Sequence, residues 1–262
     1  MSREEVLRDY EEYKVNGRVW GQVPADRITK IKFPRPSASV IERYMALPDL
    51  TTTVSDMLDG YGICGVVAAS HLKPLMPGRK IVGTAVTLRS IPERKTPTKG
   101  YLDKDPIKMS TREIYYLSEP GDVLVADFGG NVDVSNMGGQ SALVGKSTGF
   151  VGAVVNGAVR DVPAINEIDF PIWSAGATPI TGKFRMEAME INGPVTLHDI
   201  VVYPGDLICA DDSGVCVVPC DRIESLIAEA EAVGGAEDKM RELIRNKAPL
   251  SELRPLFRKR YD

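Results

Sequence analysis

Arg160 and Asp161 stand side by side, directly after a run of apolar residues. Residues 151–155 are apolar on both faces of a pleat, which is typical of a strand covered on both sides. Asn156 and Gly157 tolerate positive φ, so we expect the chain to turn there. Ligands of open α/β sheets bind at the carboxyl ends of strands. Because arginine grips carboxylates bidentately and aspartate holds hard cations, the pair predicts a small oxo acid bound beside a metal ion.

The same pair also fits a purely structural interpretation. Residues 162–167 look like the start of a helix, with Asp161 as the N-cap and Pro163 in the first turn. Arg160 would then pair with a neighbouring carboxylate. The residues alone leave both interpretations open, because paired charges mark functional sites only statistically.

Two glycine-rich segments precede this strand in the sequence. Gly129 and Gly130 follow a predicted strand over residues 123–127. The second segment opens a predicted helix and consists of Gly138, Gly139, Gln140 and Ser141. Backbone N–H groups at a helix start bind anions, and glycine permits close approach, so this segment predicts the second side of a carboxylate pocket. The alternative is that these glycines only satisfy turn geometry.

Composition excludes several other kinds of site. The net charge of -4 and the lack of a sustained basic stripe give no reason to expect nucleic acid. No Cys-x-x-Cys pair occurs, and only two histidines are present, which disfavours a structural zinc site. The cysteines lie in or beside predicted strands, so we expect them to be buried rather than nucleophilic. Neither glycine segment matches a dinucleotide fingerprint or a phosphate-binding loop.

The chain shows no feature of a membrane or exported protein. Its first residues are charged, and no apolar run approaches the ~20 residues of a membrane span. We therefore expect a soluble cytoplasmic protein with reduced thiols.

The elements that position the candidate site form one α/β domain. Residues 1–49 are predicted to be a helical and extended arm, residues 50–220 the core, and residues 221–262 a C-terminal helix and tail. Helices are expected over 3–15, from a capping box at 53–56, from another at 110–113, and over 221–246. Strands are expected over 80–88, 123–127, 151–155 and 171–175, with a long loop at 92–108. The alternation of strands and helices predicts parallel neighbours, and the short strands of 194–219 predict an antiparallel closing segment.

In an ordered set of segments the chain resembles the RraA-like family. The matching segments are 74–78, 82–87, 120–125, 149–161, 171–172, 202–206 and 211–219. Together they span about residues 51–219, while the arm and the 92–108 loop look like additions. The best-known enzymes of this family are aldolases of 4-hydroxy-4-methyl-2-oxoglutarate and 4-carboxy-4-hydroxy-2-oxoadipate.

The resemblance implies a fold, an assembly and a chemistry. It implies an α/β/α layered domain of the swivelling type, assembled as a homotrimer or homohexamer with sites near subunit boundaries. It implies that Arg160 binds the oxo-acid carboxylate, Asp161 holds Mg²⁺ or Mn²⁺, and the amides of residues 138–141 complete the pocket. The implied reaction is retro-aldol cleavage, or decarboxylation as by an oxaloacetate decarboxylase, through a pyruvate-type enolate.

One departure from the family pattern bears on the chemistry. The aldolases carry an acidic residue where this chain has Gly139. Another carboxylate could substitute for it, such as Asp127, Asp133 or one of a neighbouring subunit. Glu237 sits where the family places an acid that crosses to the next subunit, although a solvated helical glutamate fits that position equally well.

Two other functions stay open at this point. The same pocket could catalyse another reaction on a small carboxylic acid, such as an isomerase or hydratase step. Alternatively, the chain is a non-enzymatic regulator that binds an RNA-degrading enzyme, as some members of the family do. The missing acid at Gly139 favours the regulator, and the intact Arg160–Asp161 pair disfavours it.

Overall fold

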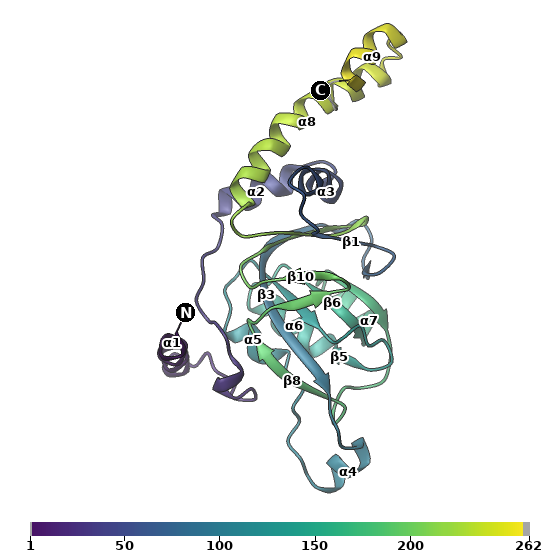
Figure 1. The fold of residues 1–262 in the computed structure, drawn as a ribbon. Coiled ribbons are helices and arrows are strands. Elements are labelled where there is room, and N and C mark those ends of the chain that lie inside the picture. Colours follow the sequence, from purple (N-terminus) through teal and green to yellow (C-terminus); the bar gives the residue numbers. More distant parts are fainter. Residues whose placement is uncertain (1, 259–262) are drawn as a thin grey trace.

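The computed structural model describes residues 2–258, except the side chains of residues 233–238 and 256–258. The protein has a mixed α/β fold built on a large mixed sheet with helices around it (Figure 1). The main path of the sheet runs β1-β12-β11-β3-β4-β6-β7-β2, while β5 pairs with β6 and β8 pairs with β3. The expected α/β class is therefore confirmed.

Parallel strands form the centre of the sheet, as the alternating pattern predicts. They are β3 (Ile81–Pro92), β4 (Asp122–Asp127), β6 (Gly152–Val159) and β7 (Ile172–Ala177), with the short β5 (Ser135–Met137) beside β6. Between them lie α5 (Arg112–Tyr116), α6 (Gly139–Ser147) and α7 (Val162–Glu167), besides the short α4 (Pro97–Leu102) in the connection from β3 to β4. Because these strands are parallel, their carboxyl ends and the following loops meet at one edge of the sheet.

Antiparallel strands close the sheet on both sides. They are β1 (Val66–Ala68), β2 (Lys73–Pro74), β8 (Met186–Ile191), β11 (Leu207–Asp211) and β12 (Gly214–Val218). A separate hairpin consists of β9 (Val195–Leu197) and β10 (Ile200–Val202). The predicted antiparallel segment over 194–219 is thus confirmed.

Three buried apolar clusters hold these layers together. On β4, Leu124 and Ala126 face the cluster shared with the helices α5, α6 and α7, whereas Val123 and Val125 face the opposite side. That opposite cluster draws only on strands and the connections beside them, including the β9–β10 hairpin. The alternation explains why residues 123–127 are apolar throughout, since both faces of the strand are covered.

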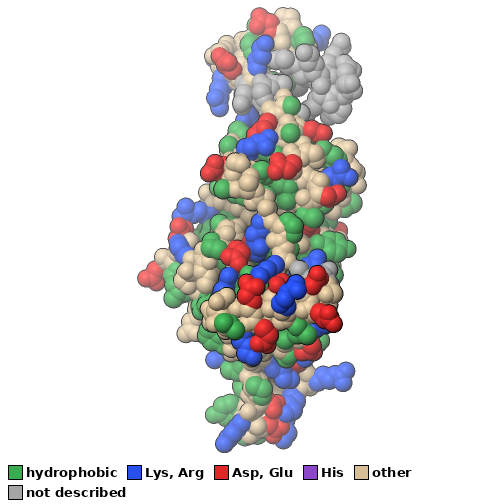
Figure 2. Space-filling model, turned by 90° about the vertical axis from the view of Figure 1, so that its left-hand side faces the viewer, with side chains coloured by type: hydrophobic (Ala, Val, Ile, Leu, Met, Phe, Trp, Pro, Cys, Tyr) green, Lys and Arg blue, Asp and Glu red, His purple; other side chains and the backbone are tan. Residues whose placement is uncertain are grey.

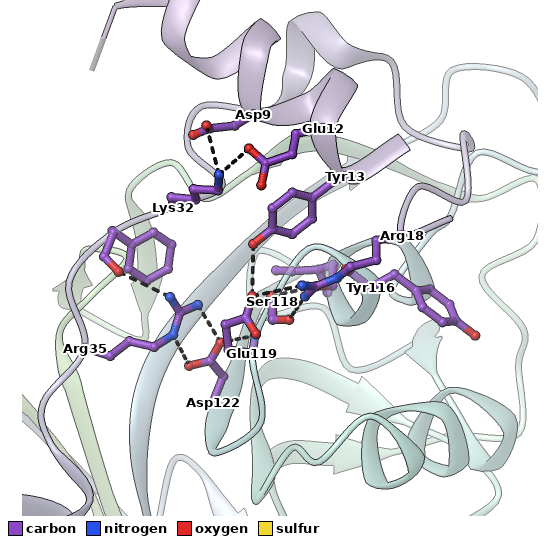
Figure 3. A network of polar contacts seen from close by, with 12 residues as sticks. Asp9, Glu12, Tyr13, Arg18, Lys32, Arg35, Tyr116, Ser118, Glu119 and Asp122 are labelled. Carbon is purple, nitrogen blue, oxygen red and sulfur yellow. Dashed lines mark hydrogen bonds and ion pairs between the residues drawn. The ribbon is translucent and has the colours of Figure 1, made fainter. Parts of the chain in front are cut away.

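The N-terminal arm docks on the body through α1 (Arg3–Val15) and a chain of polar contacts (Figure 3). Tyr13 donates its hydroxyl proton to Glu119 at 2.9 Å, and Arg35 binds both oxygens of Asp122 at 2.8 Å each. The Asp122 side chain is only 1% exposed, so this bidentate pair is largely shielded from water. Burial nevertheless raises the pKa of Asp122, against the lowering effect of Arg35. The arm ends in η1 (Ala25–Arg27) and α2 (Ala38–Ala46).

Two extensions project from the body (Figure 1). The long α8 (Ile223–Arg245) rises from α2 and α3 (Leu50–Gly60) and continues into α9 (Leu250–Arg258), while α4 (Pro97–Leu102) forms a lobe at the opposite end. Figure 2 shows basic and acidic side chains interspersed over one face of the molecule. Within residues 2–258, no helix is both long and apolar enough to cross a bilayer.

Three local predictions need correction. The helix predicted from residue 53 begins at Leu50, because the buried positions Leu50, Val54 and Leu58 continue one apolar face backwards by a turn. The predicted 92–108 loop contains α4, whose N-cap Thr96 accepts the N–H of Lys99 at 3.3 Å. The third correction concerns Asn156 and Gly157.

Asn156 and Gly157 do not turn the chain, since β6 continues to Val159 with a register irregularity between Val155 and Ala158. The Asn156 amide donates to Asp127 and to the backbone of Thr196, so it ties three strands together instead. A Cβ on Gly157 would lie 2.8 Å from the Phe128 Cβ, so the close approach of these two residues explains the glycine.

Candidate functional site

Arg160 and Asp161 lie at the carboxyl end of β6, where the pattern of residues places them. The Arg160 N–H donates to the Met137 carbonyl at 3.0 Å, which ties this strand end to β5. Asp161 is the N-cap of α7 and has left-handed backbone angles, φ 58 and ψ 35. Such a conformation costs a non-glycine residue on the order of 1 kcal/mol, although aspartate tolerates it better than most residues.

The Asp161 carboxylate does not cap the helix that it precedes. It makes no side-chain capping bond to α7. Instead its Oδ2 accepts the Gly139 N–H at 3.2 Å and lies 3.6 Å from Arg160 Nε. The predicted N-cap position of Asp161 is therefore confirmed, but its side chain makes no capping bond and points towards the glycine segment instead.

The ion-pair interpretation accounts for only part of the geometry. The Arg160–Asp161 contact uses one nitrogen and one oxygen, and the two side chains remain 36% and 43% exposed. In the described part of the chain, the terminal nitrogens of Arg160 and Oδ1 of Asp161 have no partner. These are the atoms that would bind a carboxylate and a cation.

Gly138 and Gly139 pack directly against this pair. A Cβ on Gly138 would lie 2.6 Å from Asp161 Oδ2 and 2.9 Å from Arg160 Cγ. A Cβ on Gly139 would lie 3.1 Å from the Ala164 Cβ. The structure thus brings the predicted glycine segment and the predicted charged pair together, with the closest approach at Gly138.

Replacing Gly138 with alanine is expected to displace the charged pair. The Gly138 backbone is extended, so the added Cβ acts through its clash with Asp161 and Arg160 rather than through backbone strain. Because both side chains are partly exposed, they can move aside, so the protein should lose little stability. Ligand affinity at the site should fall while the free energy of unfolding changes little, both measurable by calorimetry. Gly176→Ala, whose Cβ would meet Val132 at an ordinary 3.4 Å, is the control and should change neither.

The start of α6 supplies uncommitted backbone donors. Gly139 donates its N–H to Asp161, and the Ala142 N–H donates to the Gly138 carbonyl at 3.0 Å. Among the groups that the structure describes, the N–H groups of Gln140 and Ser141 have no acceptor. Free donors at a helix N-terminus favour an anion.

The side chains of Gln140 and Ser141 are committed elsewhere. The Ser141 hydroxyl is buried and lies 2.5 Å from the Thr111 hydroxyl, so Ser141 offers the site only its amide. The Gln140 side-chain oxygen accepts from Arg112 Nη2 at 3.2 Å. Sequence reasoning missed Arg112, because it assigned residues 110–113 only to a helix cap, and nothing in the spacing relates Arg112 to Arg160.

Asp127 does not replace the acid that is missing at Gly139. It is buried and accepts from the Gly129 N–H, the Asn156 amide, and both the N–H and the hydroxyl of Thr196, at 2.8–3.1 Å. A carboxylate with four donors links β4, β6 and β9 and is poorly suited to proton transfer. Asp133 is exposed, and the side chain of Glu237 lies outside the described residues.

The expectation that the cysteines are buried is confirmed for Cys209 and Cys216 but wrong for Cys64 and Cys220, which are exposed because they lie just outside the covered strands β1 and β12. Cys209 and Cys216 are fully buried partners on neighbouring strands. Burial raises the pKa of Cys216 to about 12 and that of Cys209 well above its usual value. Neither thiol is a nucleophile at neutral pH.

The donor set at Asp161 fits a magnesium-type ion rather than a protein-caged metal. Among the described residues, no group of three or more His, Cys, Asp or Glu side chains could hold a metal. Mg²⁺ commonly takes one or two carboxylates and fills its other positions with water and substrate oxygens. One partly exposed carboxylate with a free oxygen, beside an arginine whose terminal nitrogens could bind a substrate carboxylate, meets that requirement.

Comparison with known proteins points to one family. The model described as "RraA-like: Aldolase/RraA" matches residues 51–217. Protein DlpA of Legionella pneumophila is 30% identical over 234 residues, which cover 84% of this chain and 35% of DlpA, so the chain spans about a third of that relative. A protein of Halalkalibacterium halodurans named "Putative 4-hydroxy-4-methyl-2-oxoglutarate aldolase" is 30% identical over 202 residues, covering 77% of this chain and 86% of the relative.

A solved structure agrees with the sequence matches. Streptomyces coelicolor RraAS2, described as an unusual member of the RNase ES inhibitor RraA protein family, superposes with a TM-score of 0.65 at 26% identity. The superposition covers 80% of this chain and 99% of RraAS2. It therefore extends across nearly the whole length of that protein.

Proposed function

This chain belongs to the RraA-like family, and on that premise we propose that it is a divalent-metal-dependent lyase that breaks a carbon–carbon bond of a small 2-oxo acid. The observation that carries the proposal is the orientation of Asp161. Its carboxylate leaves its own helix uncapped and turns towards Gly139 and Arg160. The name "Putative 4-hydroxy-4-methyl-2-oxoglutarate aldolase" of a relative supports the same class of reaction.

Substrate binding falls to Arg160 and the start of α6. The free guanidinium nitrogens of Arg160 would bind the carboxylate next to the 2-oxo group bidentately. The free N–H groups of Gln140 and Ser141 would bind the same anion from the other side. This arrangement orients the 2-oxo group towards Asp161.

Asp161 would hold the cation, which we propose is Mg²⁺ or Mn²⁺. When bound, such an ion acts as a Lewis acid and stabilises negative charge that develops on the 2-oxo oxygen. Asp161 can keep Oδ1 for this purpose because Gly139 and Arg160 engage only Oδ2. The Gly139 N–H thereby fixes the orientation of the carboxylate.

Glycine at position 139 favours decarboxylation over retro-aldol cleavage. Retro-aldol cleavage needs a base that removes the proton of the 4-hydroxyl group, and Asp127, the buried acid nearby, is fully occupied. Decarboxylation of a 3-carboxylated 2-oxo acid needs no such base. The bond to the carboxylate breaks, CO₂ leaves, the electron pair forms a pyruvate-type enolate, and a solvent proton adds at C3.

Oxalate binding tests the proposed site without requiring turnover. Oxalate resembles the planar enolate of pyruvate, so we expect it to bind in the presence of Mg²⁺ and about tenfold or more weakly without the ion. Asp161→Asn should abolish the effect of Mg²⁺ in isothermal titration calorimetry. Asp169→Asn is the matched control, because Asp169 pairs with Arg79 at 2.8 Å on the surface. Equal oxalate binding with and without Mg²⁺ would rule out the metal role of Asp161.

We also propose a homotrimer or homohexamer, since a site this exposed gains enclosure from a neighbouring copy. Light scattering should give three or six times the chain mass of 28.6 kDa. The competing function is regulation of an RNA-degrading enzyme. The absence of an acid at Gly139 favours it, and RraAS2 is described as belonging to a family of RNase ES inhibitors. A chain that binds no metal but binds a ribonuclease would support that function instead.

A further inference from the structure

Arg112 contacts Gln140, a residue of the glycine segment of the candidate site. It is the first residue of α5, which packs against α6. Its Nη2 donates to the Gln140 side chain at 3.2 Å, and the backbone N–H of Gln140 is one of the free donors at the start of α6. The guanidinium of Arg112 therefore lies next to the start of α6, as does that of Arg160.

Among the described half-buried arginines, only Arg112 and Arg185 have no acidic partner, and Arg185 donates to the Thr181 carbonyl at 3.0 Å. Arg18 pairs with Glu119 at 3.1 Å, Arg27 with Glu187 at 2.7 Å and Arg35 with Asp122 at 2.8 Å. Across the described part of the chain, Arg112 contacts only the Gln140 amide and the Trp20 ring, whose centroid lies 5.6 Å from its Cζ. Most of its five N–H donors are left available to an anion.

The N-terminal arm holds Trp20 against Arg112. The buried Glu113 carboxylate accepts four successive backbone N–H groups of the arm, from Trp20 at 2.9 Å, Gly21 at 3.1 Å, Gln22 at 2.8 Å and Val23 at 3.4 Å. Arg18 donates to the Tyr116 carbonyl at 2.9 Å, and the Trp20 and Tyr116 rings lie 5.8 Å apart (Figure 3 shows Arg18 and Tyr116). These arm residues lie outside the segment 51–217 that matches the family model. The contact between Trp20 and Arg112 therefore involves a part of the chain that the family model does not cover.

We propose that Arg112 is a second anion-binding residue of this site, which contacts the end of the substrate remote from the carboxylate on Arg160. Trp20 is its positioning residue, and the arm thereby contributes to substrate selection. The inference rests on the proposed function, because it assumes that Arg160 binds the first carboxylate. It makes Arg112 the residue that distinguishes 2-oxo acids with a distal acidic group from those without one.

Two probes separate the roles of the two arginines. Pyruvate and 2-oxoglutarate share the 2-oxo acid end, but only 2-oxoglutarate carries a distal carboxylate. With Mg²⁺ present, Arg112→Gln is expected to weaken binding of 2-oxoglutarate by about tenfold and to leave pyruvate unchanged, as measured by calorimetry. Arg94→Gln removes an equal charge from the exposed lobe and should change neither affinity.

The other possible results separate a failure of the Arg112 proposal from a failure of the proposed function. If Arg112→Gln weakens both probes equally, or neither, the proposed role of Arg112 is overturned. If Arg160→Gln leaves pyruvate binding intact, the proposed function itself fails, whatever Arg112 does. Trp20→Ala should weaken 2-oxoglutarate alone, and Trp20→Phe should restore it. Unchanged 2-oxoglutarate binding in Trp20→Ala would overturn the role of the arm.

Discussion

Replacing Arg160 with glutamine is expected to weaken binding of every 2-oxo acid at this site by about 10- to 100-fold. A charge-assisted hydrogen bond contributes about 1.5–3 kcal/mol, and Arg160 offers the carboxylate a bidentate pair. Arg160 is 36% exposed, and within the described residues its guanidinium makes only the Nε contact with Asp161, so the protein itself loses little on this change. The affinity should therefore fall without a matching fall in the unfolding temperature.

Two further variants sharpen the Arg160 result. Arg160→Lys keeps the charge but loses the planar fork, so it should recover only part of the affinity. Arg79→Gln is the control, because Arg79 pairs with Asp169 on the surface and is 52% exposed. Full affinity in Arg160→Lys would mean that charge alone, and not bidentate geometry, binds the carboxylate. Full affinity in Arg160→Gln would remove Arg160 from the site.

The Glu113→Ala variant is expected to lose about 3–5 kcal/mol of folding free energy. The Glu113 side chain is fully buried and accepts N–H groups from Trp20, Gly21, Gln22 and Val23. Removing the carboxylate leaves these donors without an acceptor, and each buried unsatisfied donor costs about 1–3 kcal/mol before relaxation. Peeling the arm away from α5 would limit the loss, so chemical denaturation and proteolysis near residues 18–23 should report it together.

A matched change elsewhere on the arm isolates this effect. Glu11 is on α1, is 64% exposed and lies 3.7 Å from Lys14. Glu11→Ala should change stability by less than about 0.5 kcal/mol, as is usual for surface ion pairs. If Glu113→Ala is no more destabilised than Glu11→Ala, the arm does not depend on the Glu113 carboxylate.

The core of the candidate site could be predicted because it depends on local patterns. A strand that is apolar on both faces, followed by Arg160 and Asp161, indicates the carboxyl end of a buried parallel strand. The glycine segment at 138–141 precedes the same strand and opens a helix. Parallel strands bring these ends together at one edge, and the 3.2 Å contact from Gly139 to Asp161 is the result.

Other features depended on partners far away in the sequence. Asn156–Gly157 has the composition of a turn, yet Asn156 is held inside β6 by Asp127 and Thr196. Local preference gave way there to a tertiary contact. Asp161 has the residue type of an N-cap, but its left-handed backbone directs the carboxylate elsewhere.

The contacts of the N-terminal arm were even harder to predict from the sequence. Residues 110–113 have the form of a capping box, but the Thr111 side chain makes no capping bond and Glu113 binds the arm instead. The proposed role of the neighbouring Arg112 depends on its contacts with Trp20 and Gln140. No periodicity or spacing relates these positions, because the contacts arise only when the arm docks.

The most direct test of the account is pyruvate release from oxaloacetate by the wild-type chain and by Asp161→Asn, each with and without Mg²⁺ or Mn²⁺. The account predicts turnover that requires the metal in the wild type and is lost in Asp161→Asn, although position 139 is glycine. Metal-dependent turnover that survives in Asp161→Asn, or no turnover with either metal in a folded wild-type chain, would contradict it.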